Sequence, residues 1–311
     1  MSRRYEPNEI DPRVASTRQH TQATEGTREP ESKGQRSRSS STTSPEPSRD
    51  QRYLSPAQSR SAEPRTPYRD QHWTYSLRAS EIQTLRELGT FRAVDSEALA
   101  EIQYGGNRYR MEQDLRNLIR QSLITRRGVE GPEKDRIQVL TLTKAGQRFL
   151  ARQKLMPKDQ PIYRGLVKPR EARHDATLYR LYHKASRQIE RDGGKVRRVA
   201  LDYELKKRIN KALARLGPDK QDPKKKNEIA QAHGVRVVNG RVVVPDLQIE
   251  YDNAEGQLAR VNLELATKHY RPGQLQAKAQ AGFTLYAAAQ DSDRLRRVLN
   301  DREITAEILA L

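Results

Sequence analysis

The sequence lacks cysteine and is poor in the side chains that build a large core. Without cysteine, disulfide bonds, thiol catalysis and zinc sites with cysteine ligands are excluded. Hydrophobic residues make up 34% and aromatic residues 5% of the 311 positions, whereas charged residues make up 32%. Because this is a low share of core-forming residues for the length, we expect two small domains and a sizeable segment that does not fold.

Long apolar runs and an acidic balance are also lacking. No run approaches the length of a membrane span, and the first residues, MSRRYEPNEIDPR, have no apolar core of a signal peptide. The 59 lysines and arginines exceed the 40 acidic residues, which gives a net charge of +19. This excess favours a polyanionic partner, and no basic segment carries an apolar helical face suited to lipid. We therefore expect a cytoplasmic protein that binds nucleic acid and no membrane.

Composition divides the chain into four parts. Residues 1–72 are rich in Ser, Arg, Pro, Glu, Gln and Thr, with almost no aliphatic side chains, which predicts a disordered basic tail. Residues 73–155 form a first domain in this interpretation, and residues 156–169, with three prolines and a glycine, form a linker. Residues 170–311 form the second domain. The fold class that we expect is α+β, with a small mixed sheet in the second domain.

The first domain has the element order of a winged helix-turn-helix. Apolar periodicity predicts three helices, two strands across a Gly-Pro loop and a closing helix, over residues 81–89, 96–104, 108–121, 123–127, 135–143 and 144–155. Ser80 and Asp95 precede the first two helices as expected N-caps. Met111, Leu115, Leu118 and Ile119 form the expected inner face of the third helix.

A winged helix usually places its third helix in the major groove of DNA and its wing against the backbone. The side chains predicted to face outward on that helix are Asn107, Arg108, Arg110, Gln113, Arg116 and Asn117. Those predicted for the wing are Arg126, Arg127, Lys134 and Arg136. The basic excess favours binding of double-stranded DNA, although such domains also serve as protein-contact modules and arginines also cover ordinary solvated helix faces.

An alternating segment in the second domain brings two acidic residues onto neighbouring strands. Apolar residues alternate around Asp246, from Val242 to Tyr251, and again before Glu264, and residues 253–256 separate the two runs as a turn, so a β-hairpin is predicted. Two carboxylates on adjacent strands are suitable ligands for Mg²⁺. The alternative is a strand-start aspartate and a solvent-facing glutamate without a metal.

The remaining elements of the second domain give the order helix, strand, strand, strand, helix, strand. The long helix begins with His174 and Asp175, a basic stretch covers residues 206–226, and a helix is predicted from Pro272. Glu204 is a further acidic candidate before the hairpin. His174 suits a ligand or proton relay, but a histidine in a first helical turn is more commonly structural.

These motifs resemble two known groups of proteins. Pro245-Asp246 on one strand, Glu264 on the next and a lysine soon after resemble the PD-(D/E)XK nuclease core. The longer pattern, from Ser76 to Leu311, resembles the replication-relaxation family of plasmid and mobile-element proteins. It comprises a winged-helix start, His174-Asp175 before a long helix, and Glu-Leu-Ala-Thr leading into a lysine-bearing helix.

The resemblance implies a DNA-binding protein of plasmid replication and mobilisation, with relaxases or replication proteins as candidate partners. It implies that Asp246 and Glu264 hold Mg²⁺ or Mn²⁺ for an endonuclease reaction. The pattern places a lysine two residues after the glutamate, where this chain has Ala266. Lys268 and Lys278 are therefore the candidate catalytic lysines.

Two other outcomes stay open in the sequence. The second domain would hold DNA without cutting it if neither lysine reaches the site. Alternatively, the protein is a winged-helix transcriptional regulator with a catalytically inactive C-terminal domain, and the sequence does not decide whether it is a homodimer.

Overall fold

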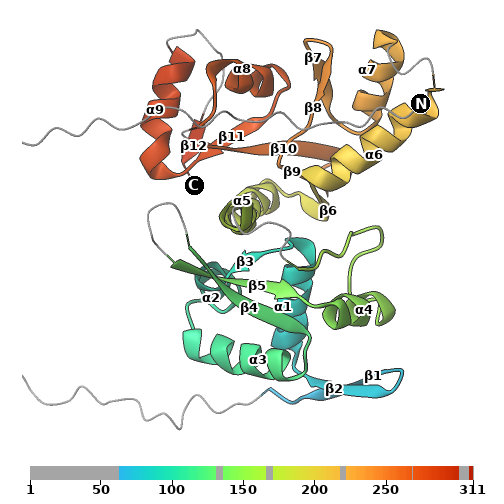
Figure 1. Cartoon of the computed structure of the whole chain (residues 1–311), viewed down its shortest axis with the longest axis vertical. Coiled ribbons are helices and arrows are strands. Elements are labelled where there is room, and N and C mark those ends of the chain that lie inside the picture. Colours follow the sequence, from blue (N-terminus) through green and yellow to red (C-terminus); the bar gives the residue numbers. More distant parts are fainter. Residues whose placement is uncertain are drawn as a thin grey trace, which may run out of the picture. The chain divides into compact units, whose positions relative to one another are not determined.

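The computed structural model (Figure 1) describes residues 63–130, 136–165, 171–217, 222–267, 269–300 and 308–310. The predicted tail up to residue 62 lies outside the described residues, as do Lys134 and Lys268. The described part is a mixed α+β structure with small sheets, as the sequence predicts. No helix within it has the length and apolar character needed to cross a membrane.

The first domain has winged-helix architecture. Its elements are α1 (Ala79–Thr90), β3 (Val94–Asp95), α2 (Ser96–Gln103), α3 (Arg108–Arg120), β4 (Ile124–Glu130), β5 (Arg136–Leu142) and α4 (Lys144–Arg152). The strands form an antiparallel sheet in the order β3-β5-β4, so β4 and β5 are the wing. Leu85 of α1, Leu99 of α2 and Leu115 of α3 are fully buried in the shared core.

Of three local predictions for this domain, one is confirmed and two are wrong. Asp95 caps α2 as predicted, since its side chain accepts from Ala98 N. Ser80 does not cap α1, because the helix already begins at Ala79 and the Ser80 hydroxyl donates to Asp114 Oδ2 at 2.6 Å. Ile119 does not face inward, because 40% of its surface is exposed.

A hairpin that the sequence did not predict precedes the winged helix. It consists of β1 (Thr66–Asp70) and β2 (Trp73–Leu77), which pair antiparallel. Tyr68 and Tyr75 place their rings edge-on to Phe149 of α4, with centroids 5.7 and 5.2 Å apart. These aromatic contacts explain why a largely polar segment forms strands, since an isolated two-stranded hairpin is only marginally stable.

The second domain has a five-stranded mixed sheet, with one long helix on one face and two shorter helices against the other (Figure 1). Its main elements are α5 (Ala172–Arg191), β6 (Lys195–Leu201), β9 (Leu247–Asp252), β10 (Leu258–Ala266), α8 (Pro272–Gln280), β11 (Thr284–Ala287), α9 (Ala289–Asn300) and β12 (Ile308–Ala310). The strand order is β12-β11-β10-β9-β6, with β6, β9 and β10 antiparallel and β10, β11 and β12 parallel. The predicted order of helix, three strands, helix and strand is confirmed.

A further subdomain is inserted between β6 and β9. It consists of α6 (Asp202–Arg215), α7 (Pro223–Ala232), β7 (Arg236–Val238) and β8 (Arg241–Val243). Its core includes Leu205, Ile209 and Val235. Val242 belongs to this insertion and not to the first strand of the predicted hairpin, because β8 pairs with β7 and β9 begins only at Leu247.

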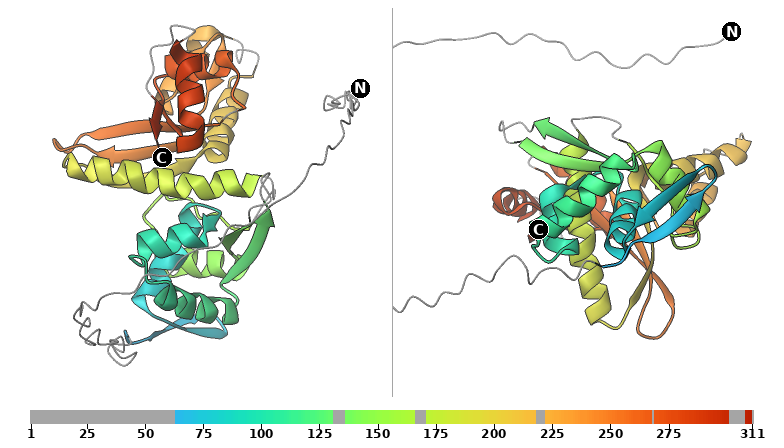
Figure 2. Two further views of the ribbon diagram at one scale, coloured as in Figure 1. Left: turned by 90° about the vertical axis from the view of Figure 1, so that its left-hand side faces the viewer. Right: turned by 90° about the horizontal axis from the view of Figure 1, so that it is seen from below.

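Helix α5 contacts both the sheet and the winged helix. Figure 2 shows α5 lying along the β9–β10 hairpin, and the helix also contacts β3 and α2. The ring of Tyr179 meets Phe91 edge-on at 5.3 Å, and Arg92 pairs with Asp175 at 3.4 Å. Tyr163, from the connecting segment, is also buried in this core.

Candidate functional site

Asp246 and Glu264 lie side by side at one end of the β9–β10 hairpin. Leu247 is the register partner of Leu263, which places Asp246 opposite Glu264. The amide of Asp246 donates to Glu264 Oε2 at 3.1 Å, and the amide of Leu265 donates to Asp246 Oδ2 at 2.9 Å. The Glu264 side chain is buried and that of Asp246 is 17% exposed. The structure therefore brings the two predicted carboxylates together.

Lys278 reaches this pair from α8. Its Nζ lies 2.6 Å from Glu264 Oε1 and donates to the carbonyl oxygen of Val244 at 2.8 Å. The hydroxyl of Tyr270 donates to the same Glu264 oxygen at 2.6 Å. Ala266, at the position where the nuclease pattern has lysine, is buried in the core that β10 shares with α8. Lys278 of α8 thus supplies to the carboxylate pair the lysine that the pattern lacks at position 266.

His174 completes the cluster from the first turn of α5. Its Nε2 lies 3.4 Å from Asp246 Oδ2, and its Nδ1 lies 3.8 Å from Asp175 Oδ1. The sequence singled out this histidine without a partner. It could not show that Asp246, seventy-two positions further along the chain, is that partner.

The charges of the cluster are balanced within the protein. Burial lowers the pKa of His174, but the carboxylates of Asp175 and Asp246 outweigh burial and raise it to about 10, so the imidazole is cationic at neutral pH. Burial opposes ionisation of Asp246, but His174, the Leu265 amide and Lys278 hold the pKa of this carboxyl below its usual range. Burial and the Asp246 charge raise the pKa of Glu264, against the opposing effect of Lys278.

The carboxylate pair fits a magnesium ion on the condition that the ion displaces Lys278 from Glu264. Mg²⁺ binds proteins through one or two carboxylates and keeps water and phosphate as its other ligands. Asp246 Oδ1 accepts no hydrogen bond from the described residues, whereas both Glu264 oxygens have protein donors. No group of three or more His, Asp or Glu side chains in the described ranges is arranged around a common metal position. An ion would therefore compete with Lys278 for Glu264.

Glu204 does not join this cluster through any contact in the described structure. It lies in the first turn of α6, where it pairs with Arg198 and accepts from the Tyr163 hydroxyl at 2.9 Å. These partners explain its burial without a metal.

The predicted DNA-contacting side chains fall into three groups. Arg108, Arg110 and Arg126 pair with acidic neighbours, namely Glu97, Glu63 and Glu112. Arg116, Arg127 and Arg136 are exposed, and Gln113 is half-buried. The prediction that Asn117 faces outward is wrong, because this side chain is buried and donates to Glu81 Oε1 at 3.0 Å.

An outward-facing residue of α3 was missed in the sequence. Tyr109 is 70% exposed next to Arg108 and Arg110. Its position in the first turn of an arginine-rich helix was the available signal, since a large exposed aromatic on such a helix suits nucleic-acid contact.

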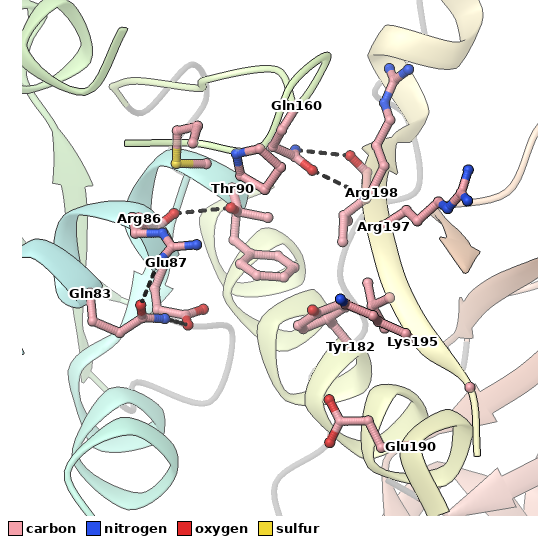
Figure 3. Close-up of a pocket in the computed structure, with 16 residues that line it drawn as sticks. Gln83, Arg86, Glu87, Thr90, Gln160, Tyr182, Glu190, Lys195, Arg197 and Arg198 are labelled. Atoms are coloured by element: carbon pink, nitrogen blue, oxygen red, sulfur yellow. Dashed lines mark hydrogen bonds between the residues drawn. The ribbon is translucent and has the colours of Figure 1, made fainter. Parts of the chain in front are cut away.

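A different pocket, of about 310 Å³, lies between α1, α5 and β6 (Figure 3). Arg197 and Arg198 line it, but they pair with Asp252 and Glu204. Gln160 is held there by two hydrogen bonds to the backbone of Val199. This pocket is separate from the Asp246 cluster, whose members do not line it.

Comparison with known proteins adds little to this geometry. No family model and no curated protein matches the chain. One similar solved structure is that of Bacillus subtilis PadR in complex with operator DNA, which aligns with 53% of this chain and 83% of its own at 17% identity and a TM-score of 0.21. A likeness at that TM-score carries no inference about fold or function.

The His174 contacts predict a pH-dependent contribution to stability. Because the folded-state pKa lies above the ordinary value of 6.5, the contribution is complete below about pH 6.5 and is lost as pH rises towards about 10. We expect His174→Gln to lower the free energy of unfolding most at about pH 6.5, with a difference from the wild type that shrinks at about pH 8 and 9.5. Urea unfolding at the three pH values measures the free energy of unfolding. His72→Gln, at an exposed position, is the matched control. A loss that is equal at all three values would contradict the charged-imidazole assignment.

Proposed function

We propose that this protein binds duplex DNA through its winged helix and cuts one strand at the Asp246 cluster, as a Mg²⁺- or Mn²⁺-dependent endonuclease of the replication-relaxation type. The observation that carries the proposal is the convergence of Asp246, Glu264 and Lys278 at one end of the hairpin, with Lys278 Nζ 2.6 Å from Glu264 Oε1. This is the donor set of the nuclease pattern, with the lysine supplied by α8.

The residues of the cluster have distinct roles in this proposal. Asp246 and Glu264 would hold the metal ion, which when bound polarises a phosphoryl oxygen and lowers the pKa of water. Lys278 would place its positive charge at the phosphate, where negative charge increases in the transition state. His174 and Tyr270 are positioning residues, since they contact Asp246 and Glu264. Hydrolysis joins a water oxygen to phosphorus, and this water releases a proton to solvent. One phosphorus–oxygen bond of the strand breaks, and the leaving oxygen takes up a proton from solvent.

The winged helix supports the DNA-binding half of the proposal. Arg116 on α3 and Arg127 on β4 are exposed and belong to the two elements that contact DNA in such domains. Phosphate contacts by such arginines supply affinity without sequence readout.

One observation favours a second candidate function. Both oxygens of Glu264 already have protein donors, and Lys278 compensates its charge. A protein that retains this closed arrangement would bind DNA without cutting it. It would be a winged-helix regulator whose C-terminal domain is catalytically inactive.

The winged-helix contacts predict a salt-dependent loss of affinity in Arg116→Ala/Arg127→Ala. Each lost phosphate contact should weaken binding to all duplex sequences alike and reduce the slope of log affinity against log salt by about 1. Fluorescence anisotropy of a labelled duplex at several salt concentrations measures both quantities. Arg294→Ala, at an exposed position on α9, removes one charge outside the winged helix and should leave both nearly unchanged. Unchanged affinity in the double variant at low salt would contradict the assignment.

The cluster predicts metal-dependent nicking of supercoiled plasmid. We expect Asp246→Asn and Lys278→Met each to lower the nicking rate at least about 100-fold, the scale on which loss of one charge-stabilising group acts. Lys195→Met, an exposed lysine on β6, is the matched control and should nick at the wild-type rate.

Two other results of the nicking assay would change the assignment. Nicking by Lys278→Met at the wild-type rate would assign the lysine role to Lys268 instead. Duplex binding by the wild type without nicking in Mg²⁺ or Mn²⁺ would overturn the endonuclease proposal and favour the regulator.

A further inference from the structure

We propose that the Asp246 cluster receives an unpaired nucleic-acid strand, with the sugar-phosphate backbone in a basic pocket on the Lys278 side and one base against Tyr203 on the His174 side. The inference rests on the proposed function only in taking the same cluster as the place where the strand is held. It concerns binding and holds whether or not the strand is cut.

The basic pocket lies between α6, the β7–β8 hairpin and α8. Its volume is about 920 Å³, and four cationic side chains line it, from Lys206, Lys226, Arg241 and Lys278. The described residues that line it include no aspartate or glutamate. Valines of the β7–β8 hairpin, with Ile209 and Leu213 of α6, supply most of the apolar part of the lining. Lys206 also pairs with Asp202 and Lys278 with Glu264, but neither carboxylate lines the pocket, so its lining is suited to a polyanionic backbone.

The aromatic pocket lies on the other side of the cluster and has a volume of about 670 Å³. Tyr163 and Tyr203 line it, with ring centroids 5.2 Å apart. Tyr163 is buried, whereas 41% of Tyr203 is exposed, and the Arg92 guanidinium lies 4.5 Å from the Tyr203 centroid. Side chains of both charge signs line this pocket, so the phosphates belong in the basic pocket and a base belongs here.

The two pockets share one lining residue, and each is lined by one cation that pairs with a carboxylate of the cluster. Lys206 lines both, Lys278 lines the basic pocket, and His174 lines the aromatic pocket. The start of α6 is fixed beside the carboxylates, because the Asp202 amide donates to the Asp246 carbonyl oxygen at 3.0 Å. Tyr203 and Lys206 are one turn apart on that helix. A strand that passes Lys206 therefore has an aromatic ring on one side of the carboxylates and cations on the other.

An unpaired strand fits this arrangement better than a duplex. A base within a duplex has both faces covered by its neighbours, so only a base outside the stack can lie against a tyrosine ring. Both volumes lie in the range of about 300 to 1,000 Å³ that is usual for pockets enclosing small groups. Stacking on tyrosine is tolerant of sequence, as is backbone contact by lysine and arginine, so we expect little sequence preference.

Equilibrium binding of a twelve-nucleotide thymidine strand with one central 2-aminopurine tests the proposal. The full-length protein is used with EDTA, so that binding is measured without cleavage, and a duplex of the same length is titrated in parallel. Stacking on the ring quenches 2-aminopurine fluorescence. We expect Tyr203→Leu to lose the quenching and to bind the single strand about 5- to 150-fold more weakly, while Tyr203→Phe retains both.

A pair of matched lysine variants tests the backbone path. Lys206→Gln should weaken single-strand binding, whereas Lys207→Gln, an exposed neighbour on α6 that lines neither pocket, should not. Duplex binding should be unchanged in the Tyr203 and Lys206 variants, since it depends on the winged helix. Thermal melting of each variant confirms that it is folded.

The outcomes separate this proposal from the endonuclease proposal. Single-strand binding of folded Tyr203→Leu with wild-type affinity and quenching would overturn it, as would an equal loss of duplex and single-strand affinity. Tyr203-dependent single-strand binding by a wild type that never nicks would instead overturn the endonuclease proposal and leave this inference standing.

Discussion

The buried contact between Asp246 and Glu264 is the constraint on which the second domain depends. Two carboxylates removed from water repel each other and lose hydration, and such burial is tolerated only with good hydrogen bonds and opposite charge nearby. Backbone amides of Asp246 and Leu265 supply part of the compensation, and Lys278 and His174 supply the charge. Because these cations come from α8 and α5, the cluster ties both helices to the hairpin between them.

Helix α5 also links the cluster to the winged helix. The first turn of α5 carries His174, and further along α5 Tyr179 packs against Phe91 at the end of α1. Arg92 contacts Asp175 of α5 and also the ring of Tyr203 in the aromatic pocket. In the function proposed above, such shared elements would fix the distance between the DNA contact of the winged helix and the cluster.

Period-2 alternation and the order of elements were enough to predict the hairpin and the neighbouring positions of Asp246 and Glu264, whereas Lys278 was a candidate, with Lys268 as the alternative, through the resemblance to the nuclease pattern. Both signals come from residues that are close together in the sequence or separated by one short turn. The β1–β2 hairpin was missed because its stability comes from rings that meet Phe149, far along the chain. Asn117 was misplaced because a polar side chain on a helix usually faces water, whereas here the buried Glu81 supplies an acceptor. The partner of His174 and the two pockets depend on tertiary contacts and on the inserted subdomain, which no local pattern encodes.

The most direct measurement of the central claim is the effect of Mg²⁺ on the melting temperature of the wild type, Lys278→Met and Lys278→Met/Glu264→Gln. If Lys278 is the counterion that a metal must displace, its removal leaves Glu264 without its cation, while His174 still pairs with Asp246. Mg²⁺ at one hundred times its dissociation constant for Lys278→Met should then stabilise this variant by about 2.7 kcal/mol, the wild type by less and the double variant hardly at all. Equal responses of all three proteins would contradict the account, because Asp246 and Glu264 would then share no metal site and Lys278 would not be its counterion.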